Sequence, residues 1–185
     1  INTVSGTGSI SLQKDDYTVG GAVSGNTLML LNDATVTFKK PVTVRQLNIR
    51  SDNTVNITGT NAFTIANTFD NLSGDALKVN RVDSNGNLLQ LADGATLVTV
   101  KDIDVSANNF ITDNTMPNST EKFLIKRNGT NVVVGSLVAK VGDEKFASFN
   151  AANEYVDAQT TGTYTIELFA DDKSADLSEL SAKVT

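Results

Sequence analysis

The 185-residue sequence contains no cysteine, no histidine and no tryptophan, and it has only two prolines. Without cysteine the fold cannot rely on disulfides, so its stability must come from packing and from hydrogen bonds within sheets. Without histidine there is no imidazole general acid–base, no imidazole metal ligand and no Ser-His or Cys-His arrangement. These absences favour a protein that was not selected for catalysis, although a compositional accident would give the same counts.

The chain also lacks long apolar runs and clusters of positive charge. No hydrophobic stretch approaches the roughly 18 residues needed to cross a bilayer, so we expect no membrane insertion. The formal net charge is −6 and the charges are interspersed. This pattern argues against a nucleic-acid partner, because phosphates are neutralised by clustered Lys and Arg. With aromatic residues at 6%, a core must be built mainly from Val, Ile and Leu.

Four similar phrases occur in the first hundred residues, each with a small acidic or amide-bearing turn followed by a short strand of alternating apolar and polar residues. They are Asn32–Phe38, Asp52–Ile57, Asp75–Val79 and Asp93–Val100. The second apolar position recurs at Ile57, Val79 and Val100, about 21 to 22 residues apart, a spacing typical of stacked structural units.

Most other recognisable segments also have the period-two pattern of half-buried strands. They are residues 42–44, 47–49, 63–65, 103–105 and 164–168. Asn128-Gly129, between apolar runs at 123–125 and 132–134, is the strongest hairpin signal in the chain. Two stretches, 150–159 and 174–182, admit a short helix, a loop or a strand.

These elements predict an all-β chain of two modules. The polar, Asn/Thr-rich run from Thr112 to Thr120 separates a β-rich module with strand–turn repeats, residues 1–116, from a small immunoglobulin-like β-sandwich, residues 117–185. Short Asx and Gly turns favour two immunoglobulin-like β-sandwich modules in series. The alternative is an N-terminal β-solenoid followed by a small β-sandwich. Tyr164, two residues after Gly162, resembles the tyrosine corner of immunoglobulin-like modules, but an ordinary strand aromatic fits equally well.

One pair of carboxylates has a spacing relevant to catalysis. Asp102 and Asp104 flank Ile103 on an expected strand, which would put them on one face about 6.6 Å apart, within the range of an inverting glycosidase. A solvated polar face explains any Asp-x-Asp strand more simply, and no Trp offers a sugar-stacking platform. We therefore assign no catalytic residue.

Several acidic turns are candidate calcium ligands, because hard cations prefer oxygen. Asp83-Ser84-Asn85-Gly86-Asn87 has oxygens at alternating positions, yet it fails as an EF-hand because position twelve is Gly94. An Asx-rich turn that caps its own backbone explains it better. The weak candidates for calcium are Asp15, Asp16, Asp83, Asn85, Asp171 and Asp172.

A modest basic stretch contains Lys39, Lys40, Arg45 and Arg50. Such charges commonly protect a sheet edge from unwanted pairing. The functional alternative is a contact with an acidic subunit or a cell-wall polymer.

Segments such as Asp93–Val100 and Gly162–Leu168, together with the Thr/Val/Asn/Ala-rich composition, resemble the body of bacterial surface-layer (S-layer) proteins and related adhesins. The resemblance implies immunoglobulin-like modules that assemble side by side into a porous lattice, often with calcium at module interfaces. No surface-layer-homology anchoring module is recognisable. With no initiator Met and no signal peptide, we expect a mature or excised piece of a longer exported protein.

We therefore expect a structural, non-catalytic segment of an extracellular bacterial surface protein in the cell wall. It would act through lateral self-assembly or as a rigid spacer. The expected partners are further copies, neighbouring domains of the same protein or cell-wall polysaccharide. The alternatives are an adhesin or carbohydrate-binding module, a polysaccharide-active enzyme such as a lyase or glycosidase, and a phage tail component.

Overall fold

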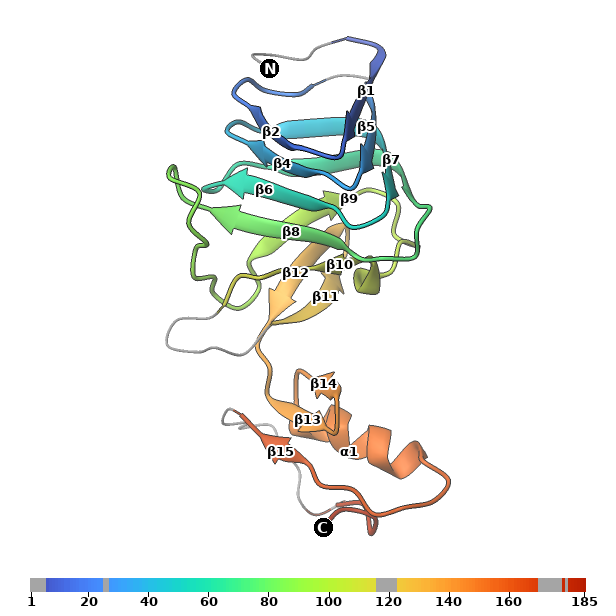
Figure 1. Ribbon diagram of the computed structural model, residues 1–185. Helices are drawn as coiled ribbons and strands as arrows, with labels where there is room; N and C mark the ends of the chain where they lie inside the picture. Colours follow the sequence, from blue (N-terminus) through green and yellow to red (C-terminus); the bar gives the residue numbers. More distant parts are fainter. Residues whose placement is uncertain (1–5, 25–26, 116–122, 170–177, 179) are drawn as a thin grey trace.

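The computed structural model describes residues 6–24, 27–115, 123–169, 178 and 180–185. It is mostly β, as the sequence predicts, with one short 3-10 turn, η1 (Ala107–Asn109), and one helix, α1 (Phe149–Ala158), in the described residues. Most strands lie in two large sheets (Figure 1).

The larger sheet, sheet A, has seven strands. In spatial order these are β1 (Gly8–Gln13), β3 (Thr27–Asn32), β5 (Val42–Arg50), β7 (Phe63–Asn71), β9 (Thr96–Val100), β12 (Asn131–Gly135) and β11 (Leu124–Asn128). Sheet B has five strands, in the order β10 (Phe110–Ile111), β8 (Leu77–Val82), β6 (Thr54–Thr58), β4 (Thr35–Phe38) and β2 (Asp16–Val19). The chain therefore alternates between the sheets: it contributes one strand to sheet A and the next strand to sheet B.

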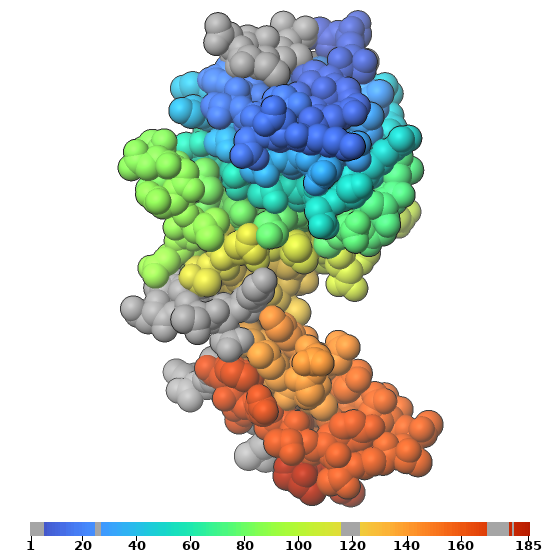
Figure 2. All heavy atoms as spheres, viewed as in Figure 1, coloured from blue at the N-terminus to red at the C-terminus, as the bar shows by residue number. Residues whose placement is uncertain are grey.

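Within each sheet the strands from β1 to β10 pair in parallel with the strands of the next rung. Val36 of β4 pairs with Val55 of β6, 19 residues on, and Val55 pairs with Val79 of β8. All three side chains are fully buried, so they form one column inside the molecule. Figure 2 shows the same order as successive layers of colour from blue to yellow. This is a β-solenoid, the alternative architecture, and the preferred pair of immunoglobulin-like sandwiches is wrong.

The corners that join the two sheets share one backbone feature. β3 and β4 are joined by only Asp33 and Ala34, and of these only Asp33 has positive φ, at 54°. β3 and β4 lie in different sheets and do not pair with each other, so this linker is a corner and not a hairpin turn. Lys14 and Ser51, with φ of 51° and 56°, occupy the equivalent place in the neighbouring corners. One left-handed residue per corner turns the chain from sheet A into sheet B.

The repeated phrases are only partly equivalent in space. The first three lie at consecutive corners, but their shared position is Val36, Val55 and Val79, because Ile57 pairs with Arg81. The fourth phrase is elsewhere, since Val100 belongs to β9 and pairs with Ile65 in sheet A. The phrase therefore marks a turn followed by a strand, and only its first three copies stack.

The solenoid core is a continuous column of aliphatic and aromatic side chains between the sheets. Phe38 and Phe63 stack with ring centroids 6.5 Å apart, and Phe69 and Phe110 lie 4.9 Å apart. Most core positions are fully buried Val, Ile and Leu, which agrees with the composition. Such burial is the main favourable term for a chain without disulfides.

The hairpin predicted at Asn128-Gly129 is confirmed. β11 and β12 pair antiparallel across it, and β12 then pairs antiparallel with β9. The hairpin therefore completes sheet A, and Phe123 and Val132 belong to the solenoid core. The expected boundary at 116/117 lies outside the described residues, but the described residues from 123 to 135, assigned from the sequence to the second module, are part of the first.

The C-terminal residues have a separate small core. β13 (Ala139–Val141) lies between β14 (Glu144–Phe146) and β15 (Glu167–Leu168), and α1 contributes Ala152 and Val156. The stretch 150–159 is thus a helix, begun by Ser148, whose hydroxyl accepts a hydrogen bond from the Ala151 N–H. Among its described residues this part has one sheet and one helix and no second, facing sheet, so the predicted immunoglobulin-like module is wrong.

Tyr164 nevertheless has the local contact expected of a tyrosine corner. Its hydroxyl donates to the Thr161 carbonyl at 2.9 Å. Gly162 has φ of 114°, and a Cβ there would come within 3.1 Å of the Tyr164 hydroxyl. The Gly-x-Tyr step is therefore a local motif that does not require an immunoglobulin fold. Residues 174–182, the other possible helix, lie mostly outside the described residues.

Candidate functional site: the stacked corners

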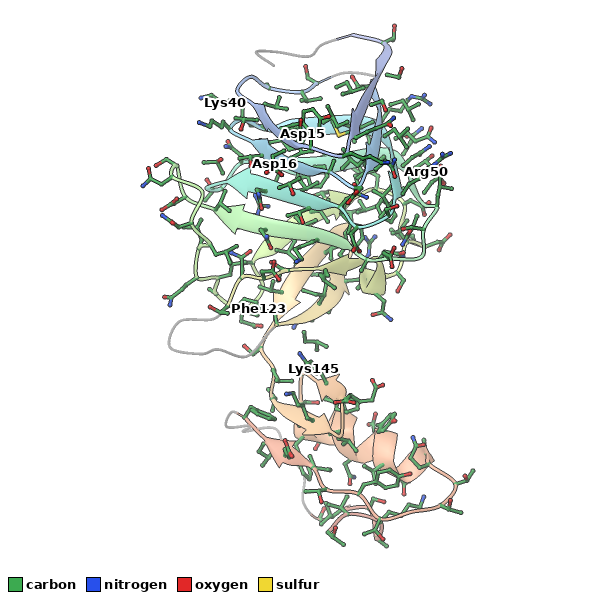
Figure 3. The ribbon with its side chains drawn as sticks, viewed as in Figure 1. Asp15, Asp16, Lys40, Arg50, Phe123 and Lys145 are labelled. Carbon is green, nitrogen blue, oxygen red and sulfur yellow. The ribbon has the colours of Figure 1, made fainter. Side chains whose placement is uncertain are left out.

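The corners that lead from sheet A into sheet B lie one above another and border an open groove of about 580 Å³. Figure 3 labels Asp15, in the corner before β2, and Asp16, the first residue of β2. The groove is lined by Lys14, Asp15, Asp16, Asp33, Ala34, Thr35, Asp52, Asn53, Thr54, Ala76, Lys78 and Ile111. The weak calcium candidates Asp15 and Asp16 are thus brought near two further carboxylates, Asp33 and Asp52.

One buried amide holds two of these corners together. Asn53 is only 3% exposed, and its Oδ1 accepts from the Ala34 N–H at 3.1 Å in the preceding rung. Its Nδ2 donates to the carbonyls of Arg50 and Ser51, each at 2.8 Å. Asn53 therefore satisfies the polar backbone of a tight turn that no strand can reach.

The charges that face the groove lie at the surface. Lys78 forms an ion pair with Asp113 at 2.9 Å, and each side chain is about one-third exposed. A pair this exposed is screened by water and contributes little stability. Among the residues that the structure describes, no group of three or more acidic side chains is arranged to hold a metal ion. The groove offers hydroxyl and carboxylate groups for hydrogen bonds with a polar partner.

The turn at Asp83 is an Asx turn, as the sequence favours. The Asp83 carboxylate accepts from the backbone N–H groups of Asn85 and Asn87, and from Asn87 Nδ2 at 3.0 Å. Asn85 takes part through its backbone. The side-chain hydrogen bond from Asn87, followed by the backbone bonds, lowers the pKa of Asp83 below its ordinary value. The remaining calcium candidates, Asp171 and Asp172, lie outside the described residues.

The pair Asp102 and Asp104 does not lie on a strand, so the expected same-face arrangement is wrong. Residues 101–105 form a turn in which the Asp104 N–H donates to Asp102 Oδ1 at 3.1 Å. Arg127 Nη2 contacts the backbone carbonyls of Val100 and Asp102. The polar pattern of residues 102–104 reflects turn formation after β9.

Sequence reasoning missed a buried polar network around Arg81. Arg81 is 7% exposed, and its guanidinium donates to the carbonyls of Asn61, Thr96 and Leu97. Burial lowers its pKa. Asn114, fully buried, bonds both the N–H and the C=O of Arg81. One signal in the sequence could have revealed it. Arg81 follows the core residue Val79 by two positions on the same strand, which puts both side chains on the same buried face.

The basic residues are distributed over the solenoid. Arg45 and Arg50 belong to β5, which lies between β3 and β7, so protection of a sheet edge is the wrong explanation for them. Lys40 precedes β5 and Arg50 ends it, and Figure 3 shows the two on opposite sides of the solenoid. A contact between some of these residues and an acidic partner remains a proposal.

The chain gave no match to protein-family models, to curated proteins or to solved structures. No helix among the described residues has the length and apolarity that a membrane crossing requires.

Replacing Asn53 with Ala should lower the free energy of unfolding by about 2 kcal/mol, because the buried Ala34 N–H and two carbonyls lose their partner. Urea denaturation measures the change. Asp52→Ala is the matched control: its side chain is exposed in the same turn, and its effect should stay within about 0.5 kcal/mol. Equal losses in the two variants would contradict this role of Asn53.

Replacing Asn87 with Ala should raise the pKa of the Asp83 carboxyl toward its ordinary value, because the largest cause of the lowering is removed. The carboxyl resonance in an NMR pH titration reports the pKa. Since the folded pKa is lowered, the ionised turn stabilises the fold above the unfolded pKa, and this contribution is lost as the pH falls through the folded pKa. Asn85→Ala keeps its backbone N–H, so it should leave the Asp83 titration nearly unchanged. A similar rise in both variants would refute the assignment to the Asn87 side chain.

Proposed function

We propose that the chain is a structural, non-catalytic segment of an extracellular bacterial surface protein of the surface-layer kind. It serves as a rigid spacer and associates with further copies of itself. The observation that carries the proposal is the in-register stacking of parallel rungs. This stacking builds length from short repeats and uses polar side chains to bond one rung to the next. Solenoids gain stability from the interfaces between neighbouring repeats, and extended surfaces follow from their geometry.

The outer face of sheet B supports this view, because polar side chains connect its rungs. Asn56 Nδ2 donates to Thr37 Oγ1, and Asn80 Nδ2 donates to Asn56 Oδ1. Thr112 Oγ1 extends the series by donating to Asn80 Oδ1. A ladder of this kind joins each rung to the next, as a spacer requires, and two of its members, Asn80 and Thr112, are buried.

The groove at the stacked corners favours a second candidate function, a carbohydrate-binding or adhesive module. Its lining of carboxylate and hydroxyl groups suits a polyhydroxylated ligand that lies across several rungs. A glycan array distinguishes the two functions: binding that is lost in Asp33→Ala would favour adhesion, and no signal would favour the structural role.

The structural proposal predicts that the protein is reached by a membrane-impermeant biotin reagent on intact cells of the organism that encodes it, with a cytosolic protein as control. It also predicts association of the purified chain in sedimentation velocity, measured with calcium and with a chelator. Labelling only after lysis, together with a monomer in both conditions, would reject the proposal.

A further inference from the structure

β1 is the outermost strand of sheet A, at the end of the solenoid opposite the β11–β12 hairpin (Figure 1). Within the part of the chain that the structure describes, no strand pairs with its outer edge. A strand edge of this kind is a template for pairing with another chain, and proteins normally protect it with charge, proline, a bulge or short length.

β1 has none of these protections. Its sequence, Gly-Ser-Ile-Ser-Leu-Gln, contains no charge and no proline, and all six residues pair with β3 in an unbroken register. The other ends of the two large sheets differ. β11 carries Lys126 and Arg127, β2 carries Asp16, and β10 has only two residues.

A tyrosine hydroxyl shows which backbone groups of β1 point outward. Tyr17 Oη donates to the Gln13 carbonyl at 2.8 Å and accepts from the Gln13 N–H at 3.2 Å. The next residue, Lys14, points the other way, since its N–H donates to the Asn32 carbonyl. Because direction alternates along a strand, the backbone groups of Ser11 and Ser9 face outward with those of Gln13. Tyr17 therefore closes the edge at Gln13 and leaves it open at Ser9 and Ser11.

We propose that this edge binds a second copy of the chain, with the two β1 strands antiparallel about a two-fold axis at Ile10. Ser9 of each copy then lies opposite Ser11 of the other, and the two residues exchange both backbone hydrogen bonds. The Tyr17–Gln13 contact stays intact and ends the ladder. The inference rests on the proposed self-association and names the surface that performs it.

The strand is self-complementary in this register. Ile10, half-buried against the end of the solenoid core, meets Ile10 of the second copy at the close, non-hydrogen-bonded position. Leu12 lies opposite Gly8, and the solvent side has only serine facing serine. No like charges oppose each other and no large side chains collide. An isologous contact of this kind closes as a dimer.

Two double variants test the register with the same positions. Ser9→Lys with Ser11→Lys places lysine opposite lysine twice across the axis, whereas Ser9→Lys with Ser11→Glu places lysine opposite glutamate twice. Like charges directly opposite destabilise strand pairing and opposite charges stabilise it. Sedimentation equilibrium up to about 1 mM, a range that covers a weak dimer, should show the dissociation constant raised about tenfold or more in the first variant and retained near wild type in the second. The side chains of Ser9 and Ser11 are both exposed, and thermal melts check that both variants fold.

Hydrogen exchange of the wild-type chain gives an independent measurement. The amides of Ser9 and Ser11 should become protected as the protein concentration rises, while those of Ile10 and Leu12, bonded to β3, should be protected at every concentration. A wild-type chain that stays monomeric would overturn the inference. Dimerisation that is equal in both double variants would overturn the position of the contact, yet leave the proposed self-association standing. Surface labelling of intact cells is independent of either result.

Discussion

The fold depends on one constraint: each rung must place its apolar residues directly over those of the next rung while its backbone is hydrogen-bonded to the same neighbour. Val36, Val55 and Val79 meet both demands at once. Because side chains alternate along a strand, a slip of one residue would turn such a column toward water. The left-handed corner residues Lys14, Asp33 and Ser51 preserve this register, because each turns the chain at the same position of its rung. The number of residues per rung can vary, as it does here, provided that the corners and the buried columns stay aligned from one rung to the next.

The same constraint decides where polar groups lie. Asn53 bonds the backbone of the corner above it, Asn80 bonds the rungs on either side, and Arg81 donates to carbonyls of neighbouring segments. These side chains replace backbone partners where strands end or rungs differ in length, so burial does not leave them unsatisfied. Carboxylates with no such role, including those at the stacked corners, lie at the surface. These buried polar side chains thus serve mainly to connect one rung to the next.

Much of the local structure could be predicted from the sequence. The strands at 42–44, 47–49 and 63–65, the Asn128-Gly129 hairpin and the Tyr164 hydroxyl contact follow from alternation and turn chemistry, which act over a few residues. Parallel stacking could not be deduced, because period-two alternation and Asx turns are equally typical of antiparallel sandwiches. The distinction lies in the pairing of strands from successive rungs, such as Val36 with Val55, which only the fold shows. Arg81 was missed because its partners are carbonyls that only the fold brings near. The sequence indicated separate acidic turns but not the groove that they border, because the walls of the groove come from different rungs.

Disulfide trapping tests the parallel register most directly, and the absence of native cysteine makes the background clean. Thr35 and Thr54 are register partners in adjacent rungs, on the outer face of sheet B. Neighbouring strands lie about 4.8 Å apart, within the range of Cα distances that a disulfide spans. The variant with cysteine at both positions should form an intramolecular disulfide on mild oxidation. The control pair Thr18 and Thr54, separated by an intervening strand, should not. Free thiols in the first variant, or equal oxidation of both, would contradict the solenoid.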